Sequence, residues 1–372
     1  MALRVVIAGG GTGGHLYPGI AVARELLSRP VEAVVSFAGT ARGIEARVVP
    51  REGFALDLIR SGGVKGKSLL GRVRGAFLVP LGLFDGWRIV SSRRPSLVIG
   101  VGGYSSGPVV LVAALRGVPT MLLEQNAVPG LTNRLLARVV KAAAVTFDST
   151  QAFFGAKAFV SGNPVRPEFF AAVGPQQETA LDDQTSSIRV LVFGGSQGAH
   201  AINVAMVEAA PQLAAGRPPL RLTHQTGDRD VEMVRTAYRQ AGVQAEVEPF
   251  LYDMGRQLAA ADVIVCRAGA TTLAEITAAG KPAILIPLPT ATDDHQRMNA
   301  ETLARAGAAA MLLQRDLTGP VLAGRLLALA GDREQRRQMS AAARSLARPD
   351  AARIIVDRAL ELATGSGAGR AR

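Results

Sequence analysis

Two copies of one pattern, about 185 residues apart, constrain the fold of this chain most strongly. Each copy is a continuous apolar run, at residues 3–8 (LRVVIA) and 188–193 (IRVLVF), followed at once by a glycine cluster and a helical pattern. The first helix is expected from about Pro18 to Leu27. A buried strand of a parallel sheet gives such a run, and glycines allow a tight turn into the next helix. The two copies predict two Rossmann-like domains in tandem.

Further apolar runs alternate with helical patterns between and after these two starts. Such alternation is typical of doubly wound α/β domains, in which helices cover both faces of a parallel sheet. The predicted fold class is therefore α/β, with two Rossmann-like domains. The further strands that we expect cover residues 31–37, 97–100, 120–123, 142–146, 220–224, 245–249, 263–266 and 283–286.

The domain boundary is expected near residue 163, where Pro164 and Pro167 interrupt the pattern. A chain of 372 residues also exceeds the size at which one hydrophobic core keeps growing. We divide the sequence into a first domain, a second domain, a last helix and a disordered tail. Their expected ranges are 1–163, 164–343, 344–363 and 364–372.

Positive charge is concentrated in the first part of the chain. Residues 1–162 hold 19 Lys and Arg against 8 Asp and Glu, a net charge of +11, whereas the remainder carries +1. This asymmetry indicates an anionic partner for the first domain. Residues 60–94, here called the basic apolar segment, hold eight cations and one acid among large apolar side chains. Its expected contact residues are Lys65, Lys67, Leu69, Leu70, Arg72, Arg74, Phe77 and Trp87.

The basic apolar segment favours an anionic membrane surface over nucleic acid, because base stacking needs more aromatic residues than the segment has. A solvated helix whose leucines face the core is the alternative.

Cys266 is the single cysteine, which excludes an intramolecular disulfide and indicates a reducing compartment. The chain opens without a secretory signal, so we expect it to stay inside the cell. The uncharged stretch 97–115 is interpreted as strand, glycine loop and helix, with a membrane span as the minor alternative.

Three glycine clusters follow expected strands, at residues 9–14, 100–107 and 194–198. The first satisfies G-x-G-x-x-G, in which glycines bring backbone N–H groups close to a diphosphate. NAD is the weaker candidate because residues 36–40 lack the acid that its ribose needs. Glycines that serve only strand–helix packing are the alternative. Ligands bind at the carboxyl ends of parallel strands, so we expect the clusters to line a cleft between the domains. Its phosphate loops would include Gly103, Gly194, Gly195 and Gly198.

Two other patterns do not carry chemistry. Residues 61–68 resemble a P-loop but have Ser61 in place of its first glycine. Asp228 and Asp230 have the spacing of a metal-binding pair, yet they precede a helical pattern, where the charge at a helix N-terminus explains them. We expect no metal ion.

Three side chains are candidates for chemistry, each with a structural alternative. His15 closes the first glycine cluster, where it would act as a general base or would cap the helix and position a ligand. Glu275 lies in residues 272–275, which have the spacing of a capping box. Asn126 precedes Pro129 and Gly130, where a turn explains it.

Together these motifs resemble one family, the MurG family of UDP-N-acetylglucosamine:lipid I N-acetylglucosaminyltransferases of peptidoglycan synthesis. The resemblance covers nearly the whole chain, and it is specific because eight strings occur in the same order. They are GGGTGGHLYPG (9–19), GVGGYSSGP (100–108), EQNAVPGLTN (124–133), GNPVR (162–166), GGSQGA (194–199), HQTG (224–227), CRAGATTLAE (266–275) and DDHQRMNA (293–300).

The resemblance implies a GT-B fold, with the active site in the cleft and a C-terminal helix that returns to the first domain. It implies inverting transfer of GlcNAc from UDP-GlcNAc to the C4 hydroxyl of MurNAc in undecaprenyl-pyrophosphoryl-MurNAc-pentapeptide (lipid I), without a cofactor, at the cytoplasmic face of the bacterial membrane. His15 would be the base, and Glu275 would hold the ribose hydroxyls. By matching motif positions, the donor site would comprise Thr12, Gly13, Gly14, Asn126, Arg166, Ser196, Leu251, Ala270, Thr271, Glu275 and Gln296.

Two positions need comment in the match to the family motifs. Gln296 is matched in preference to the adjacent His295, and His200 stands where Arg is common in relatives. Three rival functions are a nucleotide-dependent oxidoreductase, a noncatalytic membrane-associated nucleotide-sugar sensor, and a GT-B transferase acting on another membrane lipid.

Overall fold

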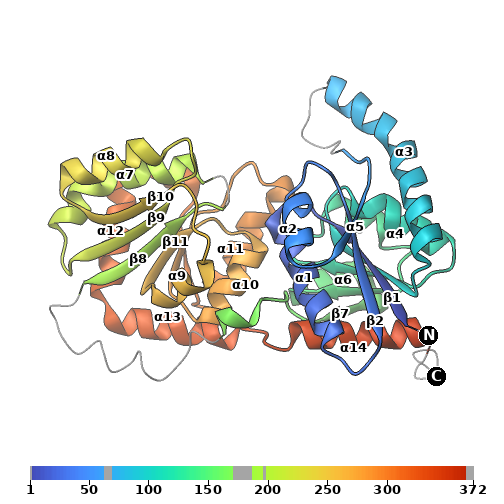
Figure 1. Ribbon diagram of the computed structural model, residues 1–372. Coiled ribbons are helices and arrows are strands. Elements are labelled where there is room, and N and C mark those ends of the chain that lie inside the picture. Colours follow the sequence, from blue (N-terminus) through green and yellow to red (C-terminus); the bar gives the residue numbers. More distant parts are fainter. Residues whose placement is uncertain (1, 63–68, 171–186, 196–197, 366–372) are drawn as a thin grey trace. The chain divides into compact units, whose positions relative to one another are not determined.

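The computed structural model describes residues 2–62, 69–170, 187–195 and 198–365, with the backbone alone for residues 69–77. The chain divides into two compact units, Met1–Val165 with Arg348–Arg372, and Arg166–Ala347. Each unit contains one parallel sheet covered by helices (Figure 1). The predicted fold class, α/β with two Rossmann-like domains, is confirmed.

The first unit is built on a seven-stranded sheet with the order β3-β2-β1-β4-β5-β6-β7, whose neighbours all pair in parallel. The order reverses beside β1, as in Rossmann folds. The central strands are buried on both faces, which explains their continuous apolar sequences. The strands are β1 (Leu3–Gly9), β2 (Ala33–Gly39), β3 (Ala55–Leu58), β4 (Leu97–Gly102), β5 (Thr120–Glu124), β6 (Ala142–Val145) and β7 (Ala158–Val160).

Helices cover the two faces of this sheet in separate layers. Ile7 and Ile99 pack in one core cluster with residues of α1, α2 and α14. Val6 and Val98 pack in another with residues of α3, α4, α5 and α6. The helices are α1 (Gly13–Leu27), α2 (Glu45–Arg51), α3 (Leu69–Arg93), α4 (Ser106–Leu115), α5 (Leu131–Leu136), α6 (Asp148–Phe154) and α14 (Ala351–Thr364).

The second unit repeats the plan with six parallel strands in the order β10-β9-β8-β11-β12-β13. Val190 and Val265 face a core cluster formed with α7, α8 and α12. The strands are β8 (Ile188–Phe193), β9 (Leu220–Gln225), β10 (Gln244–Glu248), β11 (Val263–Cys266), β12 (Ala283–Leu285) and β13 (Ala310–Met311). The helices are α7 (His200–Ala215), α8 (Val231–Ala241), α9 (Met254–Ala260), α10 (Ala270–Ala279), α11 (His295–Arg305), α12 (Gly319–Gly331) and α13 (Arg333–Ser345).

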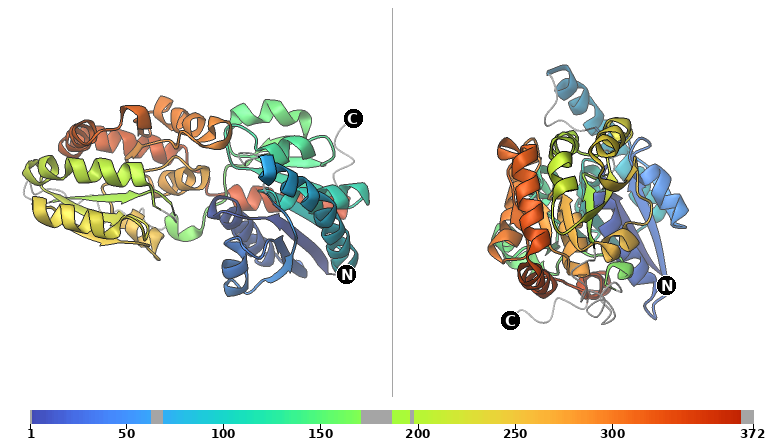
Figure 2. Two further views of the ribbon diagram at one scale, coloured as in Figure 1. Left: turned by 90° about the horizontal axis from the view of Figure 1, so that it is seen from above. Right: turned by 90° about the vertical axis from the view of Figure 1, so that its left-hand side faces the viewer.

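The last helix begins later than the sequence suggested. Residues 344 and 345 still belong to α13, and α14 starts at Ala351, after Pro349 has interrupted the helical backbone. Ile355, Val356 and Ala359 of α14 pack in the same cluster as Leu16 of α1. The final helix therefore completes the core of the first unit (Figure 2).

Residues 97–115 form β4, a glycine loop and α4, so their interpretation as strand, loop and helix is confirmed. None of the helices in the described part of the chain combines the length and the apolar character that crossing a membrane requires.

Candidate functional site

The first glycine cluster forms the connection from β1 to α1. The helix starts at Gly13, so the prediction that it begins near Pro18 is wrong. Small and polar residues fill its first turn, and they give no apolar signal before Leu16. Thr12 is the N-cap residue, with an extended backbone, and Gly13, Gly14 and His15 are the first three helical residues. His15 therefore lies on the helix rather than at the end of a loop.

Glu45, which the sequence analysis missed, is enclosed by this connection. The carboxylate is buried and accepts hydrogen bonds from the Gly11 N–H, the Thr40 N–H and the Thr40 hydroxyl, each at 2.8 Å. An acid therefore does reach the end of β2, although it comes from α2 and not from residues 36–40. Because the Gly11 N–H already has a carboxylate partner, this amide is not a donor for a diphosphate.

The second glycine cluster packs directly on the first. Gly103 has φ +78°, and a Cβ at this position would lie 2.5 Å from the Gly10 carbonyl oxygen. A side chain would therefore separate the two connections at the carboxyl ends of β1 and β4. This contact supports the alternative that Gly103 serves close packing. Its expected place in a phosphate loop stays a prediction.

Gln125 joins the same two connections through its side chain. Its Oε1 lies 3.2 Å from the His15 Nδ1, and its Nε2 donates to the Val101 carbonyl oxygen at 3.1 Å. The amide is almost completely buried. His15 itself is half-buried. The sequence placed Gln125 in a motif but gave no sign that it contacts the candidate base.

Asn126 lies in a turn organised by the buried carboxylate of Glu124. One carboxylate oxygen accepts from the Asn126 N–H at 3.1 Å and from its Nδ2 at 3.3 Å, and the other accepts from the Gly130 N–H at 2.9 Å. Asn133 Nδ2 adds a further bond at 2.9 Å. The turn that we offered as the structural alternative is present.

In the second unit, the glycine cluster after β8 has two kinds of glycine. Gly198 has φ +71°, and a Cβ there would lie 1.8 Å from the Thr226 carbonyl oxygen, so only glycine fits. Gly195 has φ +96°, but a Cβ would meet nothing within 4 Å. The described residues therefore give no packing reason for a glycine at this position. Gly194 packs against Ala199, and Ser196 lies outside the described residues.

Gln225 links this cluster to Leu251. The Gln225 Nε2 donates to the Gly195 carbonyl oxygen at 2.7 Å, and its Oε1 accepts from the Leu251 N–H at 3.1 Å. Gln225 and Leu251 are both buried. One side chain, which the sequence did not reveal, thus holds the phosphate-loop candidate Gly195 and the donor-site candidate Leu251 together.

Glu275 does not belong to a capping box. The helix α10 begins at Ala270, after the N-cap residue Gly269, so Thr272 and Glu275 are its third and sixth residues. That alternative is wrong, because the helix starts one turn earlier than the capping-box spacing requires. Ala270 and Thr271 occupy the first turn instead.

The Glu275 carboxyl group is half-buried, and burial raises its pKa from 4.5 to about 7. No hydrogen bond joins it to any residue that the structure describes. The positive charge of Arg166 partly offsets the rise in pKa. Arg166 also pairs with Glu168 at 3.1 Å and lies 5.0 Å from the Phe169 ring centre. The structure therefore brings Arg166 within electrostatic reach of Glu275.

Gln296 and His295 both make local contacts at the start of α11. The Gln296 Oε1 accepts from the Leu288 N–H at 3.0 Å, and the His295 Nδ1 lies 2.6 Å from the Thr292 carbonyl oxygen. Asp293 and Asp294 precede them with φ values of +54° and +56°, a strained conformation for aspartate. The Gln296 carbonyl group therefore fixes the preceding loop.

Asp230 has a different role from the helix-end charge that we expected. Although Asp230 is the N-cap residue of α8, its side chain makes no capping hydrogen bond. Its Oδ2 contacts the His200 Nδ1 at 2.9 Å and accepts from the Asn203 Nδ2 at 2.8 Å. The Asn203 Oδ1 in turn contacts His224 at 3.1 Å. Burial lowers the pKa of His224 to about 3, so this ring is neutral.

The basic apolar segment is described in part. Lys65 and Lys67 lie outside the described residues, and only the backbone is described for Leu69, Leu70, Arg72, Arg74 and Phe77. Further along α3, Ile89 and Val90 face the core, whereas Phe84 and Trp87 are 57% and 54% exposed and stack at 6.3 Å. The helix therefore has both a core face and an exposed aromatic face.

Asp85 is the only acid of the segment, and it is neutralised locally. Arg60 donates to both carboxylate oxygens, at 2.8 and 2.9 Å, and lowers the pKa of Asp85. Among the other described cations of the segment, Arg93 donates to both carboxylate oxygens of Asp57, at 2.8 and 2.9 Å.

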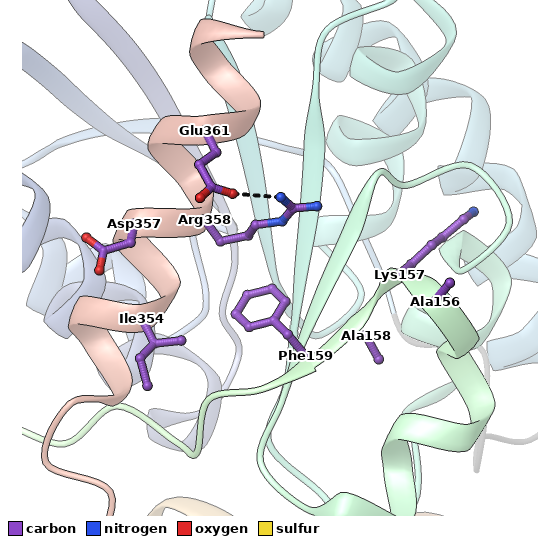
Figure 3. A pocket seen from close by; sticks show the side chains of 8 residues that line it. All are labelled: Ala156, Lys157, Ala158, Phe159, Ile354, Asp357, Arg358 and Glu361. Carbon is purple, nitrogen blue, oxygen red and sulfur yellow. Dashed lines mark hydrogen bonds and ion pairs between the residues drawn. The ribbon is translucent and has the colours of Figure 1, made fainter. Parts of the chain in front are cut away.

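A groove in the first unit lies apart from all these residues (Figure 3). It has a volume of about 320 Å³ and lies between β7 and α14, with Phe159 and Ile354 on its walls. Arg358 pairs with Glu361 at 2.7 Å, and Lys157 donates to backbone carbonyls. The groove contains no residue of the predicted site. Within the described ranges, no cluster of three or more His, Cys, Asp or Glu side chains could hold a metal ion.

Comparison with known proteins identifies the family. The glycosyltransferase family 28 N-terminal domain matches residues 5–145, and the C-terminal domain of the same family matches residues 189–355. The chain is 49% identical over 375 residues to the UDP-N-acetylglucosamine–N-acetylmuramyl-(pentapeptide) pyrophosphoryl-undecaprenol N-acetylglucosamine transferase of Pelobacter propionicus, and the alignment covers 96% of this chain and 99% of that one. A protein of the same name from Anaeromyxobacter sp. strain K is 47% identical over 374 residues, with coverages of 100% and 96%.

A solved structure agrees with these relatives. The crystal structure of MurG from Acinetobacter baumannii matches with a TM-score of 0.78 and 32% identity, covering 96% of this chain and 99% of that chain. The chain belongs to glycosyltransferase family 28 and, within it, to the MurG family. The resemblance inferred from the eight motifs is confirmed.

The raised pKa of Glu275 predicts how stability depends on pH. Between pH 4.5 and 7 the native state holds the proton that the unfolded chain releases, so stability falls as pH rises through this interval. Glu275→Gln mimics the protonated form. We expect it to stabilise the protein above pH 7 by about 1–3 kcal/mol and to change little below pH 4.5, in urea unfolding at both pH values. Glu232→Gln, an exposed site on α8, is the control. Equal destabilisation at both pH values would contradict the prediction.

Proposed function

We propose that this protein transfers N-acetylglucosamine from UDP-GlcNAc to the MurNAc C4 hydroxyl of lipid I, with inversion at the anomeric carbon. The observation that carries the proposal is the identity of 47–49%, over nearly the whole chain, with transferases whose names state this donor and acceptor. Both domains of the transferase family are present. The reaction moves a sugar from a water-soluble nucleotide to a lipid-linked sugar and releases UDP, so the protein needs a nucleotide site and access to a membrane.

The donor site that we propose lies in the second unit. The backbone at Gly195 and the helix α7 that follows would stabilise the diphosphate through N–H groups and the helix dipole. Gln225 holds this loop against Leu251, whose backbone would contact the uracil. Glu275, which has no hydrogen-bond partner among the described residues, would accept the ribose hydroxyls, with Arg166 nearby to offset charge. Ser196, Ala270, Thr271 and Gln296 complete the proposed site.

The acceptor hydroxyl would be activated by a residue of the first unit. His15 would remove the proton of the sugar hydroxyl, since a positioned imidazole is an effective base near neutral pH. Thr12, Gly13, Gly14 and Asn126 of the same unit would contribute to the donor site, and Gly103 would belong to a phosphate loop. Departure of UDP would be assisted by the N–H groups of the second-unit loop.

Membrane contact would come from the basic apolar segment. Figure 1 shows the first half of α3 extending beyond the rest of the first unit. Phe84 and Trp87 are exposed on this helix, and Leu115 and Leu135 are exposed on α4 and α5 of the same layer. We therefore propose a peripheral contact with the cytoplasmic face of an anionic membrane.

The proposed activity is tested directly by supplying labelled UDP-GlcNAc and a lipid I analogue. We expect a labelled disaccharide-lipid and free UDP in equal amounts. UDP-GlcNAc binding without transfer would favour a noncatalytic sensor. Transfer only to another membrane lipid would favour a related transferase, and a change in nicotinamide absorbance would favour an oxidoreductase.

The donor site predicts a loss of affinity in Glu275 variants. A hydrogen bond to a charged group contributes about 1.5–3 kcal/mol, so Glu275→Gln and Glu275→Ala should each raise the KM for UDP-GlcNAc roughly 10-fold or more. Circular dichroism should stay unchanged. Glu232→Gln serves again as the matched surface control. An unchanged KM in both Glu275 variants would remove this residue from the donor site.

The base assignment predicts that His15→Ala lowers kcat by about 10²- to 10⁴-fold, because the proton of the acceptor hydroxyl has no other positioned base. UDP-GlcNAc binding should be nearly unchanged, and the acidic limb of the kcat profile should change. His15→Gln keeps polar contacts and should be equally slow. Weaker donor binding with an unaltered pH profile would instead assign His15 a ligand-positioning role.

The membrane assignment predicts salt-sensitive cosedimentation with anionic liposomes. Each Lys or Arg near such a surface contributes about 1 kcal/mol, so replacing Lys65, Lys67, Arg72 and Arg74 with Ser should abolish binding. A control with the same loss of charge replaces the exposed second-unit residues Arg217, Arg221, Arg239 and Arg256. Equal binding to neutral liposomes, or equal effects of the two sets, would contradict the electrostatic account.

A further inference from the structure

We propose that Gln125 is a positioning residue that holds the proton of neutral His15 on Nδ1, so that the lone pair of the ring is on Nε2. This inference rests on the proposed function in so far as it assigns His15 a role as base. The state of the imidazole can nevertheless be measured without any turnover.

The first step of the argument concerns the orientation of the Gln125 amide. Gln125 follows β5 directly and is only 2% exposed. One end of its amide faces the Val101 main-chain carbonyl at 3.1 Å. A carbonyl oxygen only accepts hydrogen bonds, so the end that faces it must be the Nε2 donor. A flipped amide would place two oxygens in contact within a buried site, which is unfavourable.

The second step follows from the first. With Nε2 directed at Val101, the Oε1 of Gln125 faces the His15 Nδ1 at 3.2 Å. This oxygen has no proton to donate, so Nδ1 must carry the hydrogen of the bond. In a neutral imidazole only one nitrogen is protonated, and the lone pair is therefore on Nε2. A main-chain carbonyl thus determines the tautomer of His15 through one intervening amide.

The third step concerns the position of the ring. Gly102 lies next to Val101, and a Cβ on Gly102 would be 2.8 Å from the His15 Nδ1. The ring therefore packs against the backbone of the β4 connection on one side and against the Gln125 amide at Nδ1. These contacts fix which nitrogen faces Gln125, so the choice of tautomer is also a choice of the atom that serves as base.

The chain contains a matched residue in the second unit. Gln225 follows the same design at the end of β9: it is 2% exposed, donates to one backbone carbonyl and accepts from one backbone N–H. None of its described hydrogen bonds involves a histidine. Gln225→Met therefore removes a comparable buried amide without touching His15.

The test measures the tautomer directly by NMR of the full-length protein labelled with ¹⁵N at histidine. Only His15, His200, His224 and His295 contribute, and His15→Gln assigns the signal. In the unmodified protein at a pH where His15 is neutral, we expect the Nδ1–H form. In Gln125→Met, which has similar volume and no acceptor, we expect the proton to redistribute to Nε2. Gln225→Met should leave the His15 signal unchanged.

Kinetics supply a second readout. We expect Gln125→Met to lower kcat roughly 3- to 10-fold, the scale of one neutral hydrogen bond, with little change in the KM for UDP-GlcNAc. Gln225→Met should instead raise that KM. Gln125→Glu keeps an acceptor opposite Nδ1, so it should retain the Nδ1–H form. Its second oxygen faces the Val101 carbonyl and should hold a proton there, so the acidic limb of the kcat profile should stay as in the unmodified protein.

Two results would overturn the inference. One is an Nε2–H form of His15 in the unmodified protein, and the other is an unchanged tautomer in Gln125→Met. If Gln125→Met does not fold, the tautomer measured in the unmodified protein still tests the inference. If His15→Ala keeps its activity, the base assignment fails while the tautomer measurement stands, so the two failures are distinguishable.

Discussion

The parallel sheet buried on both faces is the constraint on which the rest of this structure depends. Once helices cover both faces, polar side chains have access to ligands only where strands end. Most of the described candidate donor-site residues accordingly follow a strand or open the helix after it, although Arg166 follows the edge strand β7 and Glu275 lies in the second turn of α10. The loops at these strand ends must then pack closely, as the contact between Gly103 and Gly10 shows.

Different side-chain groups hold the glycine loops in the two units, a carboxylate in the first and an amide in the second. In the first, the buried carboxylate of Glu45 takes the N–H of Gly11, so negative charge already occupies that glycine connection. In the second, the neutral amide of Gln225 holds the loop through its Gly195 carbonyl, which keeps the loop's N–H groups clear of this contact. A carboxylate would repel an anionic diphosphate at the first connection, whereas the Gln225 amide carries no charge. This difference favours the second unit as the place where the donor diphosphate binds.

Much of the fold could be predicted from the sequence because buried central strands have an unmistakable apolar pattern. The strands that were missed, β3, β7 and β13, have four, three and two residues and lie at sheet edges. A short strand with one neighbour needs no continuous apolar run. The start of α1 was missed for a related reason, since its first turn contains glycine and histidine rather than apolar residues.

The candidate site was predictable only where a local motif contains the residue. Glu45, Gln125 and Gln225 act through partners that are 34, 110 and 30 residues away in sequence, and no local pattern reveals such pairings. Glu275 shows the opposite error, because a perfect local spacing suggested a cap at a point where the helix had already begun. Its carboxyl group has instead a pKa of about 7, set by burial. In the proposed donor site, hydrogen bonds from a bound ribose would favour the ionised form and lower that pKa, so donor binding would be coupled to proton release at Glu275.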